Sequence, residues 1–265
     1  MKTAEKAADF PARWREEIRA GRWHRPTAGL SPGYAQANLV VVPHQYAYDF
    51  LLFCHRNPKP CPLLDVTDPG DPVPRVAAIG ADLRTDIPAY RVYTDGRLLE
   101  ERTDLRQVWR PDFVAFLLGC SFTFEAALSR AGVPVRHIER QCNVPMFVTT
   151  LMCRPAGPFA GPMVVSMRPI PADLVPRAVQ ICARYPLAHG APVAIGTPEA
   201  LGITDVNRPD YGDAVPIQPG EVPVFWACGV TPQAVAERAR LPLIITHAPG
   251  HMFLTDLRDE DLALH

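Results

Sequence analysis

The chain has 265 residues, enough to bury a substantial core in one large or two modest domains. Lysine and arginine together number 27 against 28 aspartate and glutamate residues, which gives a formal net charge of -1. Because no basic excess exists to attract a polyanion, nucleic-acid binding and binding to a membrane surface lose their main electrostatic support.

The N-terminus is charged and lacks the apolar core of a secretory signal, and no apolar run approaches the roughly 20 residues of a membrane span. The seven cysteines, an odd number without a CxxC pair, fit reduced thiols and argue against a structural zinc site. We therefore expect a cytoplasmic protein without a membrane anchor.

In the first half of the chain, the spacing of apolar residues predicts helices and short strands. Helices are expected over residues 4–21, 44–56, 112–118 and 121–131. Strands are expected over 62–66 and 75–79, and residues 90–93 and 98–102 should form a hairpin around Asp95-Gly96.

The second half is richer in strands. Strands are expected over 133–139, 145–152, 162–167 and 192–196, with a helix over 172–184. Residues 222–227, 232–239 and 243–246 then alternate strand, helix and strand, which favours a sheet covered on both faces. The pattern predicts a smaller α+β domain, residues 131–198, inserted into a larger α/β domain formed by residues 1–130 and 199–265.

The stretch Gly119–Glu125 places a thiol and a hydroxyl, those of Cys120 and Ser121, just ahead of a predicted helix. Free N–H groups at a helix start can lower a thiol pKa or hold an oxyanion. Glu125 lies one helical turn beyond Ser121 and could face the same pocket. The alternative is structural: Ser121 caps the helix, Cys120 is a small buried residue and Glu125 is solvated.

Two histidines follow the last predicted strand, His247 and His251. Because Pro249-Gly250 separates them, a loop is expected there instead of a helix. An imidazole with an ordinary pKa of roughly 6.5 can act as acid or base near neutrality, although a loop histidine often only binds backbone.

Three further positions combine polar side chains with turns or buried strands. Asp210 and Asp213 sit in the turn Asp-Tyr-Gly-Asp, where carboxylates can serve as base or cation ligands or simply cap the turn. His189 precedes Gly190 at the mouth of a predicted strand. Arg168 follows a buried-looking run, and its guanidinium could grip a carboxylate with two hydrogen bonds.

These blocks together resemble the D-glutamate cyclase family. The resemblance runs from Arg25-Pro26-Thr27-Ala28-Gly29 to Leu254-Thr255-Asp256, and its most specific parts are Gly119–Glu125, Gly161–Pro169, the His189 and Asp210 blocks, Gly220–Thr231 and Ile244–Phe253. It implies a larger three-layer α/β/α domain with a smaller two-layer α+β domain. It also implies a lyase that removes water as D-glutamate closes to 5-oxo-D-proline.

One stretch departs from the family pattern. After Asn143-Val144-Pro145-Met146 the family tends to continue with Tyr, Arg, Thr and Asn, whereas this chain has Phe147, Val148, Thr149 and Thr150. If the missing polar groups contact substrate in relatives, this protein prefers a different acid.

The expected reaction needs a base for the ammonium, donors for an oxyanion and an acid for the leaving oxygen. We expect His247 or His251 as acid or base with Asp210 or Glu125 assisting, and N–H groups near Cys120 and Ser121 as oxyanion donors. Substrate contacts are expected from Arg168, as carboxylate clamp, and from His189, Asn143 and Asp213.

Two alternatives to the lyase remain open from the sequence. Cys120 could be the nucleophile of a small-amide hydrolase, or the chain could be a non-catalytic carboxylate-binding protein. The expected partner is a small-molecule carboxylate. No cofactor is expected, while a divalent metal and homo-oligomerisation stay open.

Overall fold

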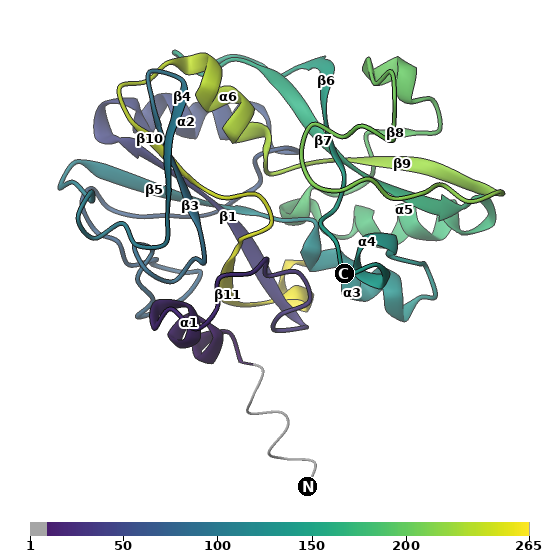
Figure 1. The fold of residues 1–265 in the computed structure, drawn as a ribbon, viewed down its shortest axis with the longest axis horizontal. Coiled ribbons are helices and arrows are strands. Elements are labelled where there is room, and N and C mark those ends of the chain that lie inside the picture. Colours follow the sequence, from purple (N-terminus) through teal and green to yellow (C-terminus); the bar gives the residue numbers. More distant parts are fainter. Residues whose placement is uncertain (1–9, 265) are drawn as a thin grey trace, which may run out of the picture.

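The computed structural model describes residues 10–264, apart from the side chains of residues 236 and 237. Two antiparallel sheets lie side by side with helices packed on them (Figure 1). The α/β class expected from the sequence is therefore confirmed. Among the described residues, no helix combines the length and the apolar character needed to cross a membrane.

The first sheet, on the left in Figure 1, has seven strands. Its order is β2-β5-β1-β10-β3-β4, and β11 pairs with β1 beside β10. The strands are β1 (Tyr34–Pro43), β2 (Leu63–Val66), β3 (Tyr90–Thr94), β4 (Arg97–Arg102), β5 (Phe113–Gly119), β10 (Ile244–His247) and β11 (Phe253–Arg258).

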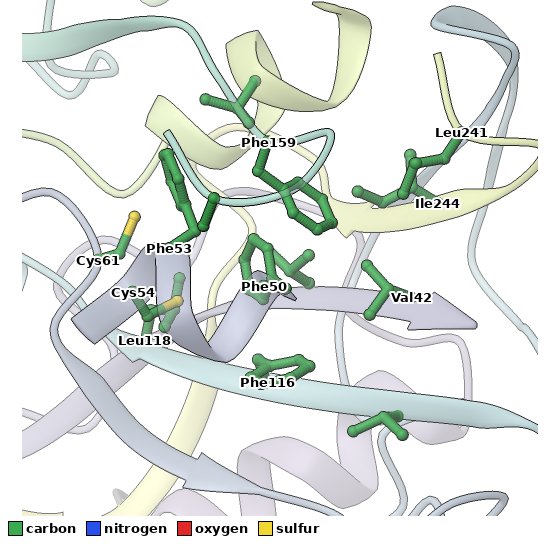
Figure 2. Close-up of a cluster of buried hydrophobic side chains, with 14 of the residues drawn as sticks. Val42, Phe50, Phe53, Cys54, Cys61, Phe116, Leu118, Phe159, Leu241 and Ile244 are labelled. Atoms are coloured by element: carbon green, nitrogen blue, oxygen red, sulfur yellow. The ribbon is translucent and has the colours of Figure 1, made fainter. Parts of the chain in front are cut away.

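One face of the first sheet is covered by α2 (His44–Arg56) and α6 (Thr231–Ala239). Figure 2 shows Phe50 and Phe53 of α2 beside Phe116 of β5 and the loop residue Phe159. Phe50 makes edge contacts with Phe116 and Phe159, with ring centroids 4.8 and 5.1 Å apart. The opposite face packs largely against irregular chain between residues 77 and 87.

The N-terminal helix α1 (Pro11–Arg19) packs on β11. Arg15 donates to Leu254 O at 2.7 Å and to Asp256 Oδ1 at 2.9 Å. The rest of the helix expected over residues 4–21 falls partly outside the described residues.

The second sheet has the order β6-β7-β9-β8, formed by β6 (Met146–Met152), β7 (Pro162–Pro171), β8 (Ala194–Ile195) and β9 (Glu221–Ala227). Helices α3 (Phe122–Arg130) and α5 (Val175–Ala183) pack on one of its faces through Phe124, Leu128 and Ala178. The loop between residues 201 and 217 covers the other face. Beyond these, the chain forms α4 (Arg136–Glu139) and 3₁₀ turns at Ala172–Leu174, Pro186–Ala188, Pro198–Leu201 and Asp259–Leu262.

Three sequence-based element predictions are wrong. The helix expected over 112–118 is strand β5, in which every residue is buried, so the apolar run carries no alternation that separates strand from helix. Residues 75–79 form bends and a turn, because Asp65 Oδ2 accepts the N–H groups of Val76 and Ala77 in place of a strand partner. The strand expected over 133–139 contains the short helix α4 instead.

Strand β9 also differs from expectation, because it lies in the second sheet. It pairs with β7 along its whole length and with β8 at Ala194↔Phe225. The expected boundary between residues 198 and 199 therefore separates two hydrogen-bonded strands. The rest of the domain division, and the three-layer arrangement of the larger part, stay predictions.

Candidate active site

Two crossovers between the sheets form the centre of the candidate site. The chain leaves the first sheet at the end of β5, turns at Cys120 and enters α3, which packs on the second sheet. Later it leaves the second sheet at the end of β9, turns at Cys228 and enters α6, which packs on the first sheet through Val235. Each crossover is a strand, a cysteine-containing turn and a helix.

A single amide side chain connects the two turns. Asn38 of β1 donates from Nδ2 to Gly119 O at 2.7 Å. The same amide packs against Gly229, where an added Cβ would lie only 2.0 Å from Nδ2. Gly229 therefore has to be glycine for the second turn to approach Asn38, and the two turns meet across this one side chain.

Beneath the first turn lies a buried ion-pair network. Arg168 of β7 is 0% exposed and donates from Nε to Glu125 Oε1 at 3.1 Å, from Nη2 to Ser121 Oγ at 3.0 Å, and from Nη1 to Ser166 Oγ at 3.1 Å. Its Nη2 also donates to Glu125. His137 Nε2 lies 3.1 Å from the same carboxylate oxygen. The charges are thus paired and hydrogen-bonded, which a buried ion pair requires.

The network also fixes the protonation state of Glu125. Burial alone would raise the pKa of Glu125, but the charges of His137 and Arg168 and their hydrogen bonds outweigh it and lower the pKa to about 2. The guanidinium lies over the neighbouring rings of Phe124 and Trp226, each with its centroid 5.4 Å from Cζ. Glu125 is therefore a permanent carboxylate at neutral pH.

The two thiols at the turns have matching surroundings. Burial raises the pKa of Cys120 to about 12, and the N–H of Phe122 partly offsets it. Burial raises the pKa of Cys228 to about 11, offset by the N–H of Val230 and the charge of Arg168. Both groups are therefore protonated thiols at neutral pH.

Comparison with known proteins identifies the family. A family model described as D-glutamate cyclase matches residues 114–256, from β5 to β11. This chain belongs to the D-glutamate cyclase family. A protein of Rubrobacter xylanophilus named "Putative hydro-lyase" is 66% identical over 247 residues, covering 93% of this chain and 95% of that protein. A protein of the same name from Stutzerimonas stutzeri is 63% identical over 254 residues, covering 96% of both chains.

The likeness to relatives extends to Bacillus subtilis, where a similarly named protein is 59% identical over 247 residues, 93% of this chain and 96% of that one. Among solved structures, a nitrogen repressor-like protein from Methanococcus jannaschii aligns over 92% of this chain and 97% of its own. Its TM-score of 0.39 and identity of 10% support no argument about this chain.

In this member of the D-glutamate cyclase family, the structure gathers four of the predicted residues into one place. Cys120, Ser121, Glu125 and Arg168 all belong to the first turn or to the network beneath it. Because Arg168 is completely buried and four hydrogen bonds from its guanidinium go to Glu125, Ser121 and Ser166, its geometry favours a positioning role over the expected clamp on a substrate carboxylate.

The histidine His189 lies on the far side of the same turn. Gly119 touches Leu187 so closely that an added Cβ would lie 1.7 Å from its carbonyl oxygen, and His189 follows at a left-handed φ of 75°. Its Nδ1 lies 2.6 Å from Lys59 O, while Nε2 has no hydrogen-bond partner within residues 10–264. Burial lowers the pKa of His189 to about 4, so the imidazole is neutral.

The two histidines after β10 differ in exposure. His247 is buried, its Nδ1 lies 3.3 Å from Leu39 O, and burial lowers its pKa to about 4. His251 is half-buried, with Nδ1 3.0 Å from Pro249 O. An added Cβ on the adjacent Gly250 would lie 2.9 Å from Asn143 Nδ2, so this loop and Asn143 are in contact.

The two predicted aspartates brace the backbone of β6 and its approach. Asp213 Oδ2 accepts the N–H of Asn143 at 2.8 Å, and Asp210 Oδ2 accepts the N–H of Val148 at 2.8 Å. Both are exposed, and Asp210 lines a polar hollow of about 280 Å³. Among the described residues, no hydrogen bond or ion pair joins either carboxylate to the Cys120 network.

The three residues at which this chain departs from the family pattern, Phe147, Val148 and Thr150, lie in different environments. Phe147 is buried against Phe225 on the face away from Cys228, with ring centroids 6.4 Å apart. Val148 packs with the cluster that contains Cys228, whereas Thr150 is exposed beside Gly202. Of the three, only Val148 belongs to the cluster around the thiols.

Sequence reasoning missed four polar residues of the network and its turns: Asn38, His137, Ser166 and Cys228. Asn38 is one of two amides, with Gln36, in the buried run of β1, which is a detectable signal. No group of three or more His, Cys, Asp or Glu side chains suited to a metal occurs among the described residues. The expectation about cofactors and metals stays a prediction.

Proposed function

We propose that this protein is a hydro-lyase that closes D-glutamate, or a closely related small amino acid, into 5-oxo-D-proline with release of water. The observation that carries this proposal is membership of the D-glutamate cyclase family, at 59% to 66% identity to relatives named as hydro-lyases. The assembly of acid–base groups at the two crossovers supports it.

Ring closure sets clear chemical demands. The amino nitrogen attacks the γ-carboxyl carbon, an oxyanion forms, and the carbon–oxygen bond breaks as water leaves. The nitrogen starts with three protons and ends with one, and the departing oxygen gains two. A folded substrate held in place supplies much of the acceleration, and donors for the oxyanion supply more.

The first turn fits the acid and oxyanion functions. Backbone N–H groups near Cys120 and Ser121, just ahead of α3, serve as oxyanion donors. The protonated thiol of Cys120 donates a proton to the leaving oxygen. The same raised pKa argues against the amide-hydrolase alternative, because a nucleophilic cysteine needs a thiolate.

The remaining groups divide into a base and supports. Half-buried His251 is the better candidate base, because His247 is buried and its Nδ1 is engaged with Leu39. Glu125 and Arg168 hold the first turn in place through Ser121. Asp210 and Asp213 support the start of β6.

Access to the thiols requires movement. Cys120 and Cys228 are each 7% exposed, so a substrate reaches them when the segments around the two turns separate. Closure afterwards would exclude water, which favours a reaction that releases water.

The proposal is tested by incubating the purified protein with D-glutamate and L-glutamate and following 5-oxoproline by chiral chromatography. The reverse reaction is followed from 5-oxo-D-proline, each with a chelator and with added Mg²⁺ or Mn²⁺. We expect turnover of the D form. Absence of turnover in both directions under all these conditions would remove D-glutamate as the substrate.

A further inference from the structure

The two crossovers present two thiols in equivalent positions. Cys120 follows the last residue of β5 and precedes α3, and Cys228 follows the last residue of β9 and precedes α6. Each interacts with a backbone N–H two residues further on, at or just before the start of the following helix, from Phe122 and Val230 respectively. One crossover runs from the first sheet to the second, and the other runs back. Because both have the order strand, cysteine and helix, the two thiols are alike in chemical surroundings and in burial.

The two thiols also lie close together. Asn38 contacts both turns, through a hydrogen bond to Gly119 and through close packing against Gly229. Phe122, whose N–H faces Cys120, packs against the cluster that contains Cys228 and Val230. Cys228 also contributes to the raised pKa of Cys120.

A third polar group at the first turn lacks a partner. Thr123, in the first turn of α3, is 1% exposed, and its Oγ1 has no hydrogen-bond partner among the described residues. A buried hydroxyl without a partner is costly, so a ligand group at this turn would satisfy it. This observation is independent of the cysteines.

The chemistry of ring closure requires two proton transfers from nitrogen to oxygen. One thiol can complete one transfer by giving its proton to the departing oxygen and regaining one that the base, His251, has taken from the substrate nitrogen. A second thiol completes the second transfer in the same way, and both end as thiols, so protons and charge balance without another reactant.

Resting on the proposed function, we infer that Cys228 is a second catalytic thiol, which acts with Cys120 on the same bound amino acid. Each thiol protonates the leaving oxygen once and regains one proton, which His251 as the base takes from the amino nitrogen and passes on. The site thus uses one acid–base group from each crossover.

The activity test compares Cys228→Ser and Cys120→Ser with Cys153→Ser. Cys153 is a matched control, because burial raises its pKa to about 11 as well, but it packs in the cluster around Phe50 and Phe53. Loss of one acid–base group should reduce kcat by about 10²–10⁴-fold with little change in KM. The basic limb of the pH profile of kcat should shift in Cys228→Ser, whereas Cys153→Ser should stay within a few-fold of the wild type.

The geometric test needs no turnover and no variant that has to fold. Wild-type protein is treated with dibromobimane, which bridges neighbouring thiols, and the linked peptides are identified by mass spectrometry. A bridge between Cys120 and Cys228 is expected, and its absence, with other cysteine pairs linked, would contradict the pairing.

The outcomes separate the two proposals. Full kcat in a folded Cys228→Ser protein, alongside an active wild type, would overturn the second thiol and leave the hydro-lyase intact. A wild type without turnover would overturn the proposed function and the catalytic role with it. Melting temperatures of all variants establish that a lost activity is not lost folding.

Discussion

At the scale of single residues, Glu125 is the counter-ion on which the buried ion-pair network depends. It is 3% exposed, and its carboxylate compensates Arg168, which is completely buried. A buried guanidinium without its counter-ion is strongly unfavourable. Removing Glu125 alone should therefore cost much more stability than the intact pair contributes in net terms. Both residues act on the candidate site by holding Ser121 and the first turn.

Replacing Glu125 by glutamine should therefore lower the free energy of unfolding by about 3–5 kcal/mol, because Arg168 would keep its charge without a counter-ion. Urea unfolding at pH 7 measures the effect. The control is Glu260→Gln, an exposed carboxylate paired only with Arg258, which should change stability by less than about 0.5 kcal/mol. Equal stabilities of the two variants would contradict the role of Glu125.

The lowered pKa of Glu125 also predicts how the stability of the protein depends on pH. The pKa of Glu125 is about 2 in the folded protein and roughly 4.3 in an unfolded chain. Its stabilisation is therefore complete above about pH 5 and is lost as the pH falls toward 2. Wild-type stability should decline over this window more steeply than that of Glu125→Gln, as measured by urea midpoints.

At the scale of elements, the two crossovers depend on close approaches that only glycine permits. Gly229→Ala would place a methyl group 2.0 Å from the amide of Asn38 and push the second turn away from the first. We expect about 1–3 kcal/mol lower stability, from overpacking, together with a loss of activity larger than the stability change explains.

Gly161→Ala is the control for this substitution. Its added Cβ would lie 3.1 and 3.4 Å from side-chain atoms of Val235 and Arg238, which can move slightly, and 3.5 Å from the backbone Cα of Val235, an ordinary contact. The comparison uses thermal melting and 5-oxoproline formation. A Gly229→Ala protein as active as Gly161→Ala would show that the approach to Asn38 is not needed.

The elements also show what sequence patterns can and cannot predict. Amphipathic helices such as α2 and the hairpin around Asp95-Gly96 were predicted with nearly their observed bounds, because turn residues and spacing mark them locally. Strand β5 was misassigned because it is buried on both faces. The sequence singled out Gly119–Glu125, which forms part of the candidate site, but it did not single out Cys228 and Asn38, since their contacts join strands distant in sequence.

At the scale of the whole molecule, several buried histidines make the fold sensitive to acid. His189 and His247 are neutral in the folded protein, with pKa values lowered to about 4, and an unfolded histidine titrates at roughly 6.5. Between these values the unfolded chain binds more protons, so stability falls as the pH drops from about 6.5 to 4. Asp259 acts in the opposite sense, because burial raises its pKa to about 7.

Substitution of His189 isolates its contribution to this sensitivity. Asparagine tolerates the left-handed backbone found there, so His189→Asn should fold and should lose less stability than wild type between pH 7 and pH 4. His44→Asn, at an exposed position, is the control and should follow the wild-type curve. Parallel curves for all three proteins in urea titrations would contradict this assignment.

The position of β1 in the first sheet has a consequence for synthesis of the chain. This early strand pairs with β5, but its other neighbours, β10 and β11, lie about two hundred residues later, as in Val40↔Thr246 and Ala37↔Phe253. The ribosome must therefore synthesise the chain as far as β11 before all the partner strands of β1 are available. Until then one edge of β1 has unpaired N–H and C=O groups that can pair with an incorrect strand. We therefore expect the nascent chain to benefit from chaperones.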